Sequence, residues 1–142
     1  MRDESGMMKD EILLSMGKRS DNPGKEKAMQ FSVRIVKLHQ SLRREKKEFT
    51  ISDQILRSGT SIGANIAEAE YAASDKDMLN KLQIALKEAA ETCYWLELLY
   101  KTDFVQEKQF ISLMNDCVEL RKLLAASTRT LSAKLQKTAK PI

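Results

Sequence analysis

The stretch LNKLQIALKEAAETCYWLELLY, residues 79–100, decides the fold of this chain. Its apolar residues recur alternately three and four positions apart, which places them on one face of an α-helix. Ser74, with Asp77 three residues later, is a capping-box pattern and predicts where this helix begins. Thr102 and Asp103 predict where it ends. The apolar face consists of Leu79, Leu82, Leu86, Ala89, Cys93, Leu96 and Tyr100.

Three other segments repeat this apolar spacing, within residues 31–42, 55–66 and 110–131. No glycine or proline occurs between Ala64 and Lys140, so that part of the chain has room only for long helices and short connections. We expect four helices. The first covers about residues 25–45, and the second runs from a cap at Ser52 or Asp53 to about residue 71. The third runs from Ser74 to about residue 101, and the fourth from Asp103 to about residue 135. Short connections make sequential helices antiparallel neighbours. The prediction is an all-α fold, an antiparallel up-down-up-down four-helix bundle.

The bundle is expected to occupy residues 25–137, between an N-terminal extension and a short tail. The extension, residues 1–24, is partly ordered at most and ends in the turn signal Asn22-Pro23-Gly24; the tail is residues 138–142. The uninterrupted apolar stretch near the start, Ile12–Leu14, is too short for a signal peptide or a membrane span, so we expect a cytoplasmic protein without a membrane partner. Cys93 and Cys117 are isolated from each other in sequence, and we expect buried free thiols.

Two glycines lie inside the second predicted helix, in the motif RSGTSIGANIAEA, residues 57–69. Each costs about 0.5–1 kcal/mol relative to alanine. Gly59 and Gly63 are four residues apart and, with Ala67, form a groove free of large side chains on one helix face. The groove has two interpretations, which the residues leave open. It accepts a bulky side chain of its own bundle, such as Trp95 or Phe31, or it is a contact for another subunit.

The same motif, followed by KLQIALKEAAETCYWLELL at 81–99, resembles the four-helix-bundle proteins related to the 23S rRNA intervening-sequence proteins. The resemblance covers about residues 26–124. It implies a four-helix bundle that assembles as a ring-like homopentamer, and it favours the subunit interpretation of the groove. A more distant resemblance, to the accessory protein of diversity-generating retroelements, implies a basic pentamer that binds nucleic acid.

Charge is unevenly distributed along the chain. The net charge is +4 overall, but it is +5 over residues 25–50, −4 over 51–103 and +4 over 104–142. A basic segment favours contact with phosphate groups of RNA or DNA, although a basic helix face is also often only a solvated one. The alternative function is an oligomeric scaffold for a protein partner. The candidate nucleic-acid contacts are Arg34, Lys37, Arg43, Arg44, Lys46 and Lys47.

Catalytic chemistry is not indicated by any motif. A carboxylate-bridged metal pair in a helical bundle needs Glu-x-x-His on two helices, and the chain has one histidine, His39, outside such a motif. No phosphate-binding loop or nucleophile–histidine pattern is visible. We therefore expect a non-enzyme without a metal or cofactor.

Polar residues near the predicted core need hydrogen-bond partners, because an unpaired buried group costs about 1–3 kcal/mol. One hypothesis is a register-fixing network in which Asn65 and Glu68 bond across to Glu88 or Thr92 of the third helix. The alternative is that the glutamates are solvated, with surface pairs between residues four apart on the third helix, at 87 and 91 and at 97 and 101.

Overall fold

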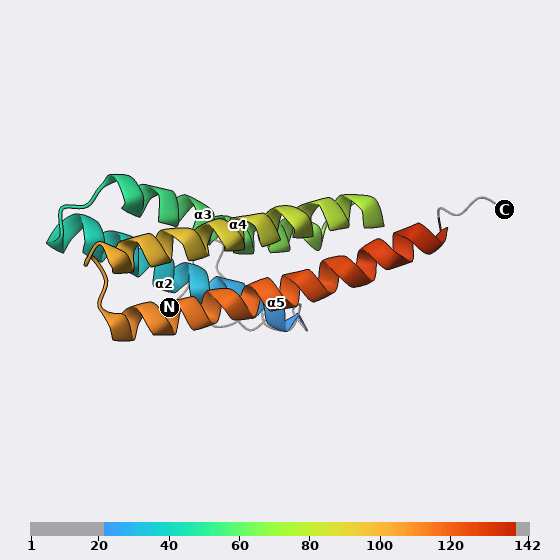
Figure 1. Ribbon diagram of the computed structural model, residues 1–142. Helices are drawn as coiled ribbons and strands as arrows, with labels where there is room; N and C mark the ends of the chain where they lie inside the picture. The colour runs from blue at the N-terminus through green and yellow to red at the C-terminus, as the bar shows by residue number, and fades with distance from the viewer. Residues whose placement is uncertain (1–21, 139–142) are drawn as a thin grey trace, which may run out of the picture.

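The structure, a computed structural model, describes residues 22–138, and all its regular elements are helices (Figure 1). They are α2 (Pro23–Glu45), α3 (Thr50–Ala69), α4 (Asp75–Lys101) and α5 (Glu107–Thr138). Over these described residues there is no strand. The predicted all-α class is confirmed, and the N-terminal extension up to residue 21 lies outside the described residues.

Successive helices run in opposite directions, as Figure 1 shows. The ion pairs between α2 and α3 agree with this antiparallel arrangement. Lys25 near the start of α2 pairs with Glu70 just after the end of α3. Arg43 near the end of α2 pairs with Asp53 near the start of α3. The connections between helices are four or five residues long, which leaves room only for a reversal of direction. Each helix therefore packs beside its sequence neighbours, and α2 also contacts α5.

Helix α2 begins earlier than the sequence analysis predicted. The side-chain oxygen of Asn22 accepts a hydrogen bond of 3.0 Å from the amide of Gly24, and Pro23 occupies the first helical position. Proline suits that position because its missing amide hydrogen has no helical partner there. The segment predicted to be a turn is thus the N-cap and first turn of α2.

Helix α3 also begins before its predicted cap. It starts at Thr50, and the carboxylate of Glu48 accepts from one amide of its first turn, that of Ile51, at 2.5 Å and 3.1 Å by its two oxygens. Ser52 is buried and donates its hydroxyl to the carbonyl of Glu48 at 2.9 Å. The prediction of Ser52 or Asp53 as the cap is wrong, because Glu48 reaches the helix end from the turn.

The ends of α4 follow the sequence pattern closely. The Ser74 hydroxyl accepts from the amide of Asp77 at 3.1 Å, which confirms the predicted cap. At the other end the amide of Phe104 bonds to the carbonyl of Leu99, and that of Asp103 to the carbonyl of Tyr100. Asp103 has a φ of 65°, the left-handed conformation that closes helices in this arrangement.

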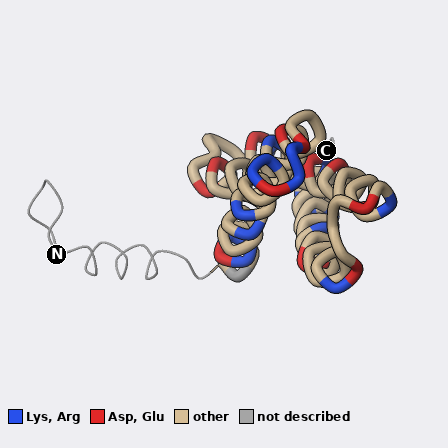
Figure 2. The backbone as a smooth tube through the Cα atoms, turned by 90° about the vertical axis from the view of Figure 1, so that its left-hand side faces the viewer, with Lys and Arg blue, Asp and Glu red and all other residues tan. Residues whose placement is uncertain are grey.

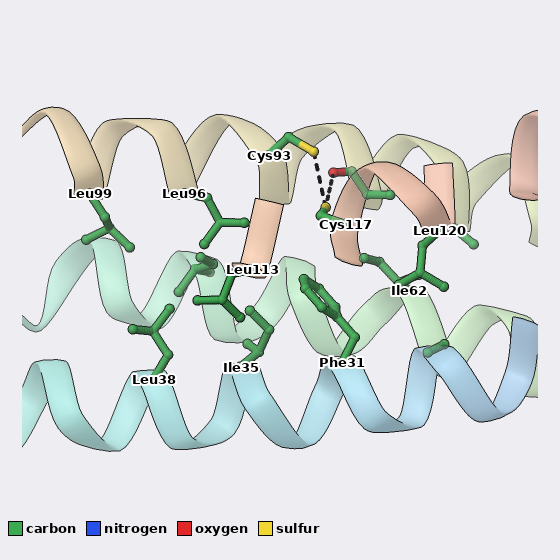
Figure 3. Close-up of a cluster of buried hydrophobic side chains, with 14 of the residues drawn as sticks. Phe31, Ile35, Leu38, Ile62, Cys93, Leu96, Leu99, Leu113, Cys117 and Leu120 are labelled. Carbon is green, nitrogen blue, oxygen red and sulfur yellow. Dashed lines mark hydrogen bonds between the residues drawn. The ribbon is translucent and has the colours of Figure 1, made fainter. Parts of the chain in front are cut away.

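Apolar side chains from all four helices form one core (Figure 3). Helix α4 lies between α3 and α5. Of its predicted apolar face Ala89, Cys93 and Leu96 are buried, and the other four residues are half-buried. Ala85 and Leu99, outside the predicted face, are fully buried. Among the described residues no buried side-chain nitrogen or oxygen lacks a hydrogen-bond partner. The largest fully buried apolar side chains are Phe31, Ile35, Leu42, Ile55, Ile62, Leu96, Leu99, Leu113 and Leu120.

The helices differ in length, and the longest, α5, extends beyond the start of α2 (Figure 1). Near that end Met78, Leu82 and Leu131 line a surface hollow between α4 and α5 and are only half-buried. Across residues 22–138 we find no helix whose length and apolarity would let it cross a membrane.

Candidate nucleic-acid interface

Arg34, the first of the six predicted contact residues, is engaged with α5 at the surface of the bundle. Its Nη1 lies 2.6 Å from Asp116 Oδ2 and its Nη2 donates to the Ser112 hydroxyl at 2.9 Å, both on α5. A guanidinium whose charge is balanced by a carboxylate has little left to offer a phosphate. Arg34 therefore ties α2 to α5 and is not part of the candidate surface.

Arg43 is engaged as well, at the start of α3. Its Nη1 lies 3.3 Å from Asp53 Oδ1, an oxygen that also lies 2.9 Å from His39 Nε2. The Arg43 guanidinium is stacked over the ring of Phe49, 4.8 Å from its centroid. Arg43 thus holds both Asp53 and Phe49 in place at the corner where α2 meets α3.

The remaining four predicted residues, which we call the corner cations, are Lys37, Arg44, Lys46 and Lys47. All four are exposed, and within the described part of the chain none forms an ion pair. Figure 2 looks onto this end of the bundle, and the blue segments of the turn between α2 and α3 face the viewer. Arg44, Lys46 and Lys47 therefore lie at this end of the bundle, whereas Lys37 lies about two turns before the end of α2, so the unpaired positive charge extends from the turn along α2.

The local backbone explains why the cations gather here. Arg44 lies in the last turn of α2, where the helix dipole favours positive charge. The turn is closed by hydrogen bonds from the amides of Lys46 and Glu48 to the carbonyl of Leu42. Lys47 adopts a φ of 56°, so the chain turns sharply between Lys46 and Glu48.

An exposed aromatic ring lies beside the corner cations, and the sequence analysis did not identify it as functional. Phe49 is 48% exposed and, with Val36 and Leu56, lines a surface hollow of about 610 Å³ between α2 and α3. Arg44 borders the same hollow. The Arg43 guanidinium covers one face of the Phe49 ring, so a nucleic-acid base can stack only on the opposite face. The signal available in the sequence was the position of Phe49 two residues after the end of the basic run at Lys47.

The small-residue groove faces α2 of the same chain. A Cβ atom at Gly59 would lie 2.9 Å from two carbons of Ile35, and one at Gly63 would lie 3.3 Å from the Ser32 hydroxyl. The side chain that occupies the groove at Gly59 is therefore Ile35, and not Trp95 or Phe31 as the sequence analysis suggested. Ala67, one turn further along, is half-buried.

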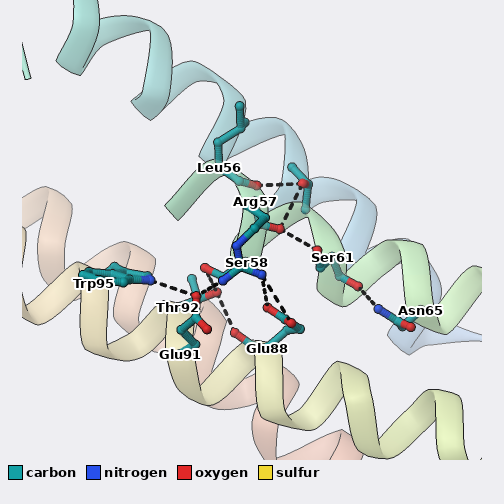
Figure 4. A network of polar contacts seen from close by, with 10 residues as sticks. Leu56, Arg57, Ser58, Ser61, Asn65, Glu88, Glu91, Thr92 and Trp95 are labelled. Carbon is teal, nitrogen blue, oxygen red and sulfur yellow. Dashed lines mark hydrogen bonds and ion pairs between the residues drawn. The ribbon is translucent and has the colours of Figure 1, made fainter. Parts of the chain in front are cut away.

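Arg57 is the centre of the polar contacts between α3 and α4 (Figure 4). Its Nη1 lies 3.2 Å from a carboxylate oxygen of Glu88, and its Nη2 contacts Glu91. The Glu91 carboxylate also accepts a 3.0 Å hydrogen bond from the Trp95 indole. The sequence analysis considered these glutamates but missed Arg57 as their partner.

The predicted register network is corrected at Asn65. Its side-chain amide donates to the carbonyl of Ser61 at 2.8 Å and so stays within α3. Glu68 does reach α4, through Lys81 at 3.1 Å. The buried link between these helices does involve Thr92 of α4, which was a predicted partner, but its hydroxyl bonds at 2.9 Å to Ser58 of α3, which was not in the predicted network.

The two surface pairs predicted on α4 have different outcomes. Glu97 pairs with Lys101 at 2.9 Å, as the spacing of four residues predicted. Glu91 is held by Arg57 rather than by Lys87. No group of three or more His, Cys, Asp or Glu side chains within residues 22–138 is arranged to hold a metal ion.

Comparison with known proteins finds a family model and solved structures that match this chain. Residues 21–126 match the model of the family described as 23S rRNA-intervening sequence protein. A crystal structure of a protein of unknown function from the S23 ribosomal protein family of Bacteroides thetaiotaomicron is 56% identical in sequence. The match covers 74% of this chain and 97% of that chain, with a TM-score of 0.73. None of the curated proteins compared with this chain matches it.

Proposed function

The chain belongs to the 23S rRNA-intervening sequence protein family, and from that membership we propose that it is a non-enzymatic homo-oligomer that binds the backbone of a nucleic acid. The proposed binding surface comprises the corner cations and the Phe49 ring beside them. The observation that carries the proposal is that all four corner cations are exposed and unpaired within the described residues, while Arg34 and Arg43 have carboxylate partners.

The surface suits backbone contacts rather than base readout. Lysine side chains bind phosphates as point charges and release counterions, without reporting the sequence. Stacking on Phe49 is equally tolerant, because every base has a π-face. The family name refers to 23S rRNA, and the solved relative is described as a member of a ribosomal protein family, so RNA is the nucleic acid to test first.

Assembly strengthens this surface. One subunit carries a net charge of +4, which makes it a weak binder of polyanions. Five copies, the number that the family resemblance implies, carry roughly +20 and let several weak contacts act on one strand. We propose that the ring presents its corner cations together.

An apolar stripe on α2 supports assembly. Met29, Val33 and Val36 recur four and three residues apart on one face of the helix and are between 37% and 62% exposed. A ring needs two different contact surfaces on each subunit. We propose the α2 stripe as one surface and the half-buried hollow between α4 and α5, around Met78 and Leu82, as the other.

The second candidate function, an oligomeric scaffold for a protein partner, has one observation in its favour. Tyr71 and Tyr94 are exposed, and tyrosine is among the side chains that contribute most to protein–protein binding. Tyr71 follows the end of α3 that lies away from the corner cations. A scaffold binds its partner with weak dependence on salt and without RNA.

The proposal is tested by measuring size and RNA binding on matched variants. Light scattering gives the oligomeric mass, and mobility shift gives RNA binding. In one variant Lys37, Arg44 and Lys46 become Gln; in the control, Lys76, Lys87 and Lys108, which are also exposed and without an ion pair in residues 22–138, become Gln. We expect the first variant to lose RNA binding and the control to keep it. Equal binding by both variants, or no binding by the wild type, would contradict the proposal.

A further inference from the structure

Two cysteines face each other across the interface between α4 and α5 (Figure 3). The Sγ atoms of Cys93 and Cys117 are 3.1 Å apart, and both residues are free and buried. A disulfide bond is about 2.05 Å long, so the two sulfurs need to approach by only about 1 Å to form one. The two residues come from different helices, so this proximity is a product of the fold.

The two sulfurs differ in their surroundings. Cys93 is 9% exposed, and Arg121 Nη1 lies 3.9 Å from its Sγ. Cys117 is fully buried, and its Sγ lies 3.3 Å from the Ala89 carbonyl oxygen. Arg121 also lines a surface hollow of about 250 Å³ next to this pair of helices. Cys93 is thus the sulfur nearer to solvent, and Cys117 lies behind it.

Ionisation of Cys93 is favoured by the same neighbours. The pKa of Cys93 is lowered to about 6, mainly because its thiolate accepts a hydrogen bond from the Cys117 thiol. Burial opposes this shift, and the Arg121 guanidinium adds to it. The pKa of Cys117 is raised, because Cys117 keeps its proton for that hydrogen bond and because it is buried. Nucleophilic cysteines have such surroundings, with a cation at the sulfur, whereas cysteines that only fill space in a core do not need one.

We propose that Cys93 and Cys117 form a redox-active dithiol that a hydroperoxide oxidises to an intramolecular disulfide between α4 and α5. The Cys93 thiolate attacks the outer peroxide oxygen, the O–O bond breaks, and the leaving alkoxide or hydroxide takes up a proton. Cys93 is then a sulfenic acid. The Cys117 sulfur attacks Cys93 Sγ, the S–O bond breaks, and the oxygen leaves as water with the Cys117 proton. Two thiols and one hydroperoxide give one disulfide, one alcohol or water, and one water.

Arg121 has a positioning role in this scheme. Its guanidinium lies 3.9 Å from the Cys93 sulfur, so it favours the thiolate at the more exposed position. The geometry therefore assigns the attacking role to Cys93 and the resolving role to Cys117. Exchange of these roles would require a hydroperoxide to reach a fully buried sulfur.

The test oxidises the reduced full-length chain with hydrogen peroxide and identifies the product by mass spectrometry. We expect the intact wild-type chain to lose two hydrogen atoms and a digest without reductant to contain a Cys93–Cys117 linked peptide. In Cys117→Ser we expect a sulfenic acid at Cys93, captured by a 1,3-diketone, and in Cys93→Ser no capture. Arg121→Gln should slow disulfide formation severalfold, and the midpoint of the rate against pH should rise.

Two results would overturn the proposal. One is a wild-type chain that keeps both thiols while free glutathione in the same solution is fully oxidised. The other is a disulfide between chains in place of the internal one. Capture at Cys117 in Cys93→Ser, with none at Cys93 in Cys117→Ser, would refute the assigned roles. The wild-type measurement needs no substitution, so it stands even where a variant folds poorly.

Discussion

Gly59 of α3 and Ile35 of α2 approach so closely that a methyl group at Gly59 would lie 2.9 Å from two carbons of the Ile35 side chain. Ile35 is fully buried, so it has no free space into which to move. The absence of a side chain at Gly59 therefore lets α2 and α3 pack at this distance, and that contact offsets the cost of a glycine inside a helix.

The same substitution one turn apart should have opposite effects on stability. Gly59→Ala forces Ile35 to shift and should lower the free energy of unfolding by about 1–3 kcal/mol. Gly63→Ala meets the Ser32 hydroxyl at 3.3 Å, which can rotate, and Ala28 at the ordinary contact distances of 3.5 and 3.6 Å. The higher helix propensity of alanine should therefore leave stability unchanged or raise it by up to about 1 kcal/mol. Urea denaturation of both variants measures the difference. Equal effects at the two positions would show that Ile35 does not fill the groove as described.

The buried hydroxyl pair between α3 and α4 gives an asymmetric prediction. The Thr92 hydroxyl bonds both to Ser58 and to the carbonyl of Glu88, so Ser58→Ala leaves Thr92 one partner. Thr92→Val removes the partner of Ser58, which is fully buried. We expect Thr92→Val to lower the free energy of unfolding by about 1–3 kcal/mol and Ser58→Ala to lower it by less. The double variant should lose less stability than the sum of the two single losses. An additive pair of effects in a double-mutant cycle would contradict this coupling.

The fold could be predicted from the sequence because its signals are local and repeated. Apolar spacing located all four helices, and the Ser74–Asp77 pattern located one helix start to the residue. The starts of α2 and α3 were predicted too late in the sequence. Asn22 and Glu48 accept hydrogen bonds from amides in the first turns of these helices, and Pro23 is the first helical residue of α2. Residues of these types also occur in turns, so the sequence does not reveal these contacts.

The candidate surface was only partly predictable, for a different reason. The sequence identifies cations but not the carboxylates that neutralise them across the bundle. Arg34 and Asp116 are 82 residues apart, and no pattern in the sequence connects them. The pairing of Cys93 with Cys117 and of Arg57 with Glu88 likewise depends on helix packing. Local patterns therefore predict elements, whereas the charge that remains available to a ligand follows from tertiary contacts.

The α2 stripe makes a prediction about assembly. Val33 is exposed in the middle of the stripe, and Val33→Glu would place a charge in the proposed subunit contact, where burial without a partner is costly. Light scattering should show a lower mass for this variant than for the wild type. Ala90→Glu, at an exposed position of α4, is the matched control and should keep the wild-type mass. An unchanged mass for Val33→Glu would exclude the stripe from the contact.

The thiol pair makes a prediction about pH. The pKa of Cys93 is about 6 in the folded chain against an ordinary value of 9.0, because of its hydrogen bond to Cys117 and of Arg121. Between about pH 6 and 9 Cys93 keeps its proton in the unfolded chain and has released it in the folded chain. The contribution of Cys93 to the free energy of unfolding therefore grows as the pH rises, and it is lost as the pH falls through about 6. Under reducing conditions the wild type should gain stability relative to Cys93→Ser between about pH 6 and 9. A constant difference across this window would contradict the shift.

If the corner cations bind the nucleic-acid backbone, RNA binding must weaken as the salt concentration rises. The logarithm of the association constant is measured against the logarithm of salt concentration for the wild type and for the variant with Gln at Lys37, Arg44 and Lys46. We predict a linear fall for the wild type with a slope of about −3 or steeper, and a slope shallower by about 1 for each phosphate contact that the variant loses. A wild-type slope near zero, or the same slope in both proteins, would contradict the account.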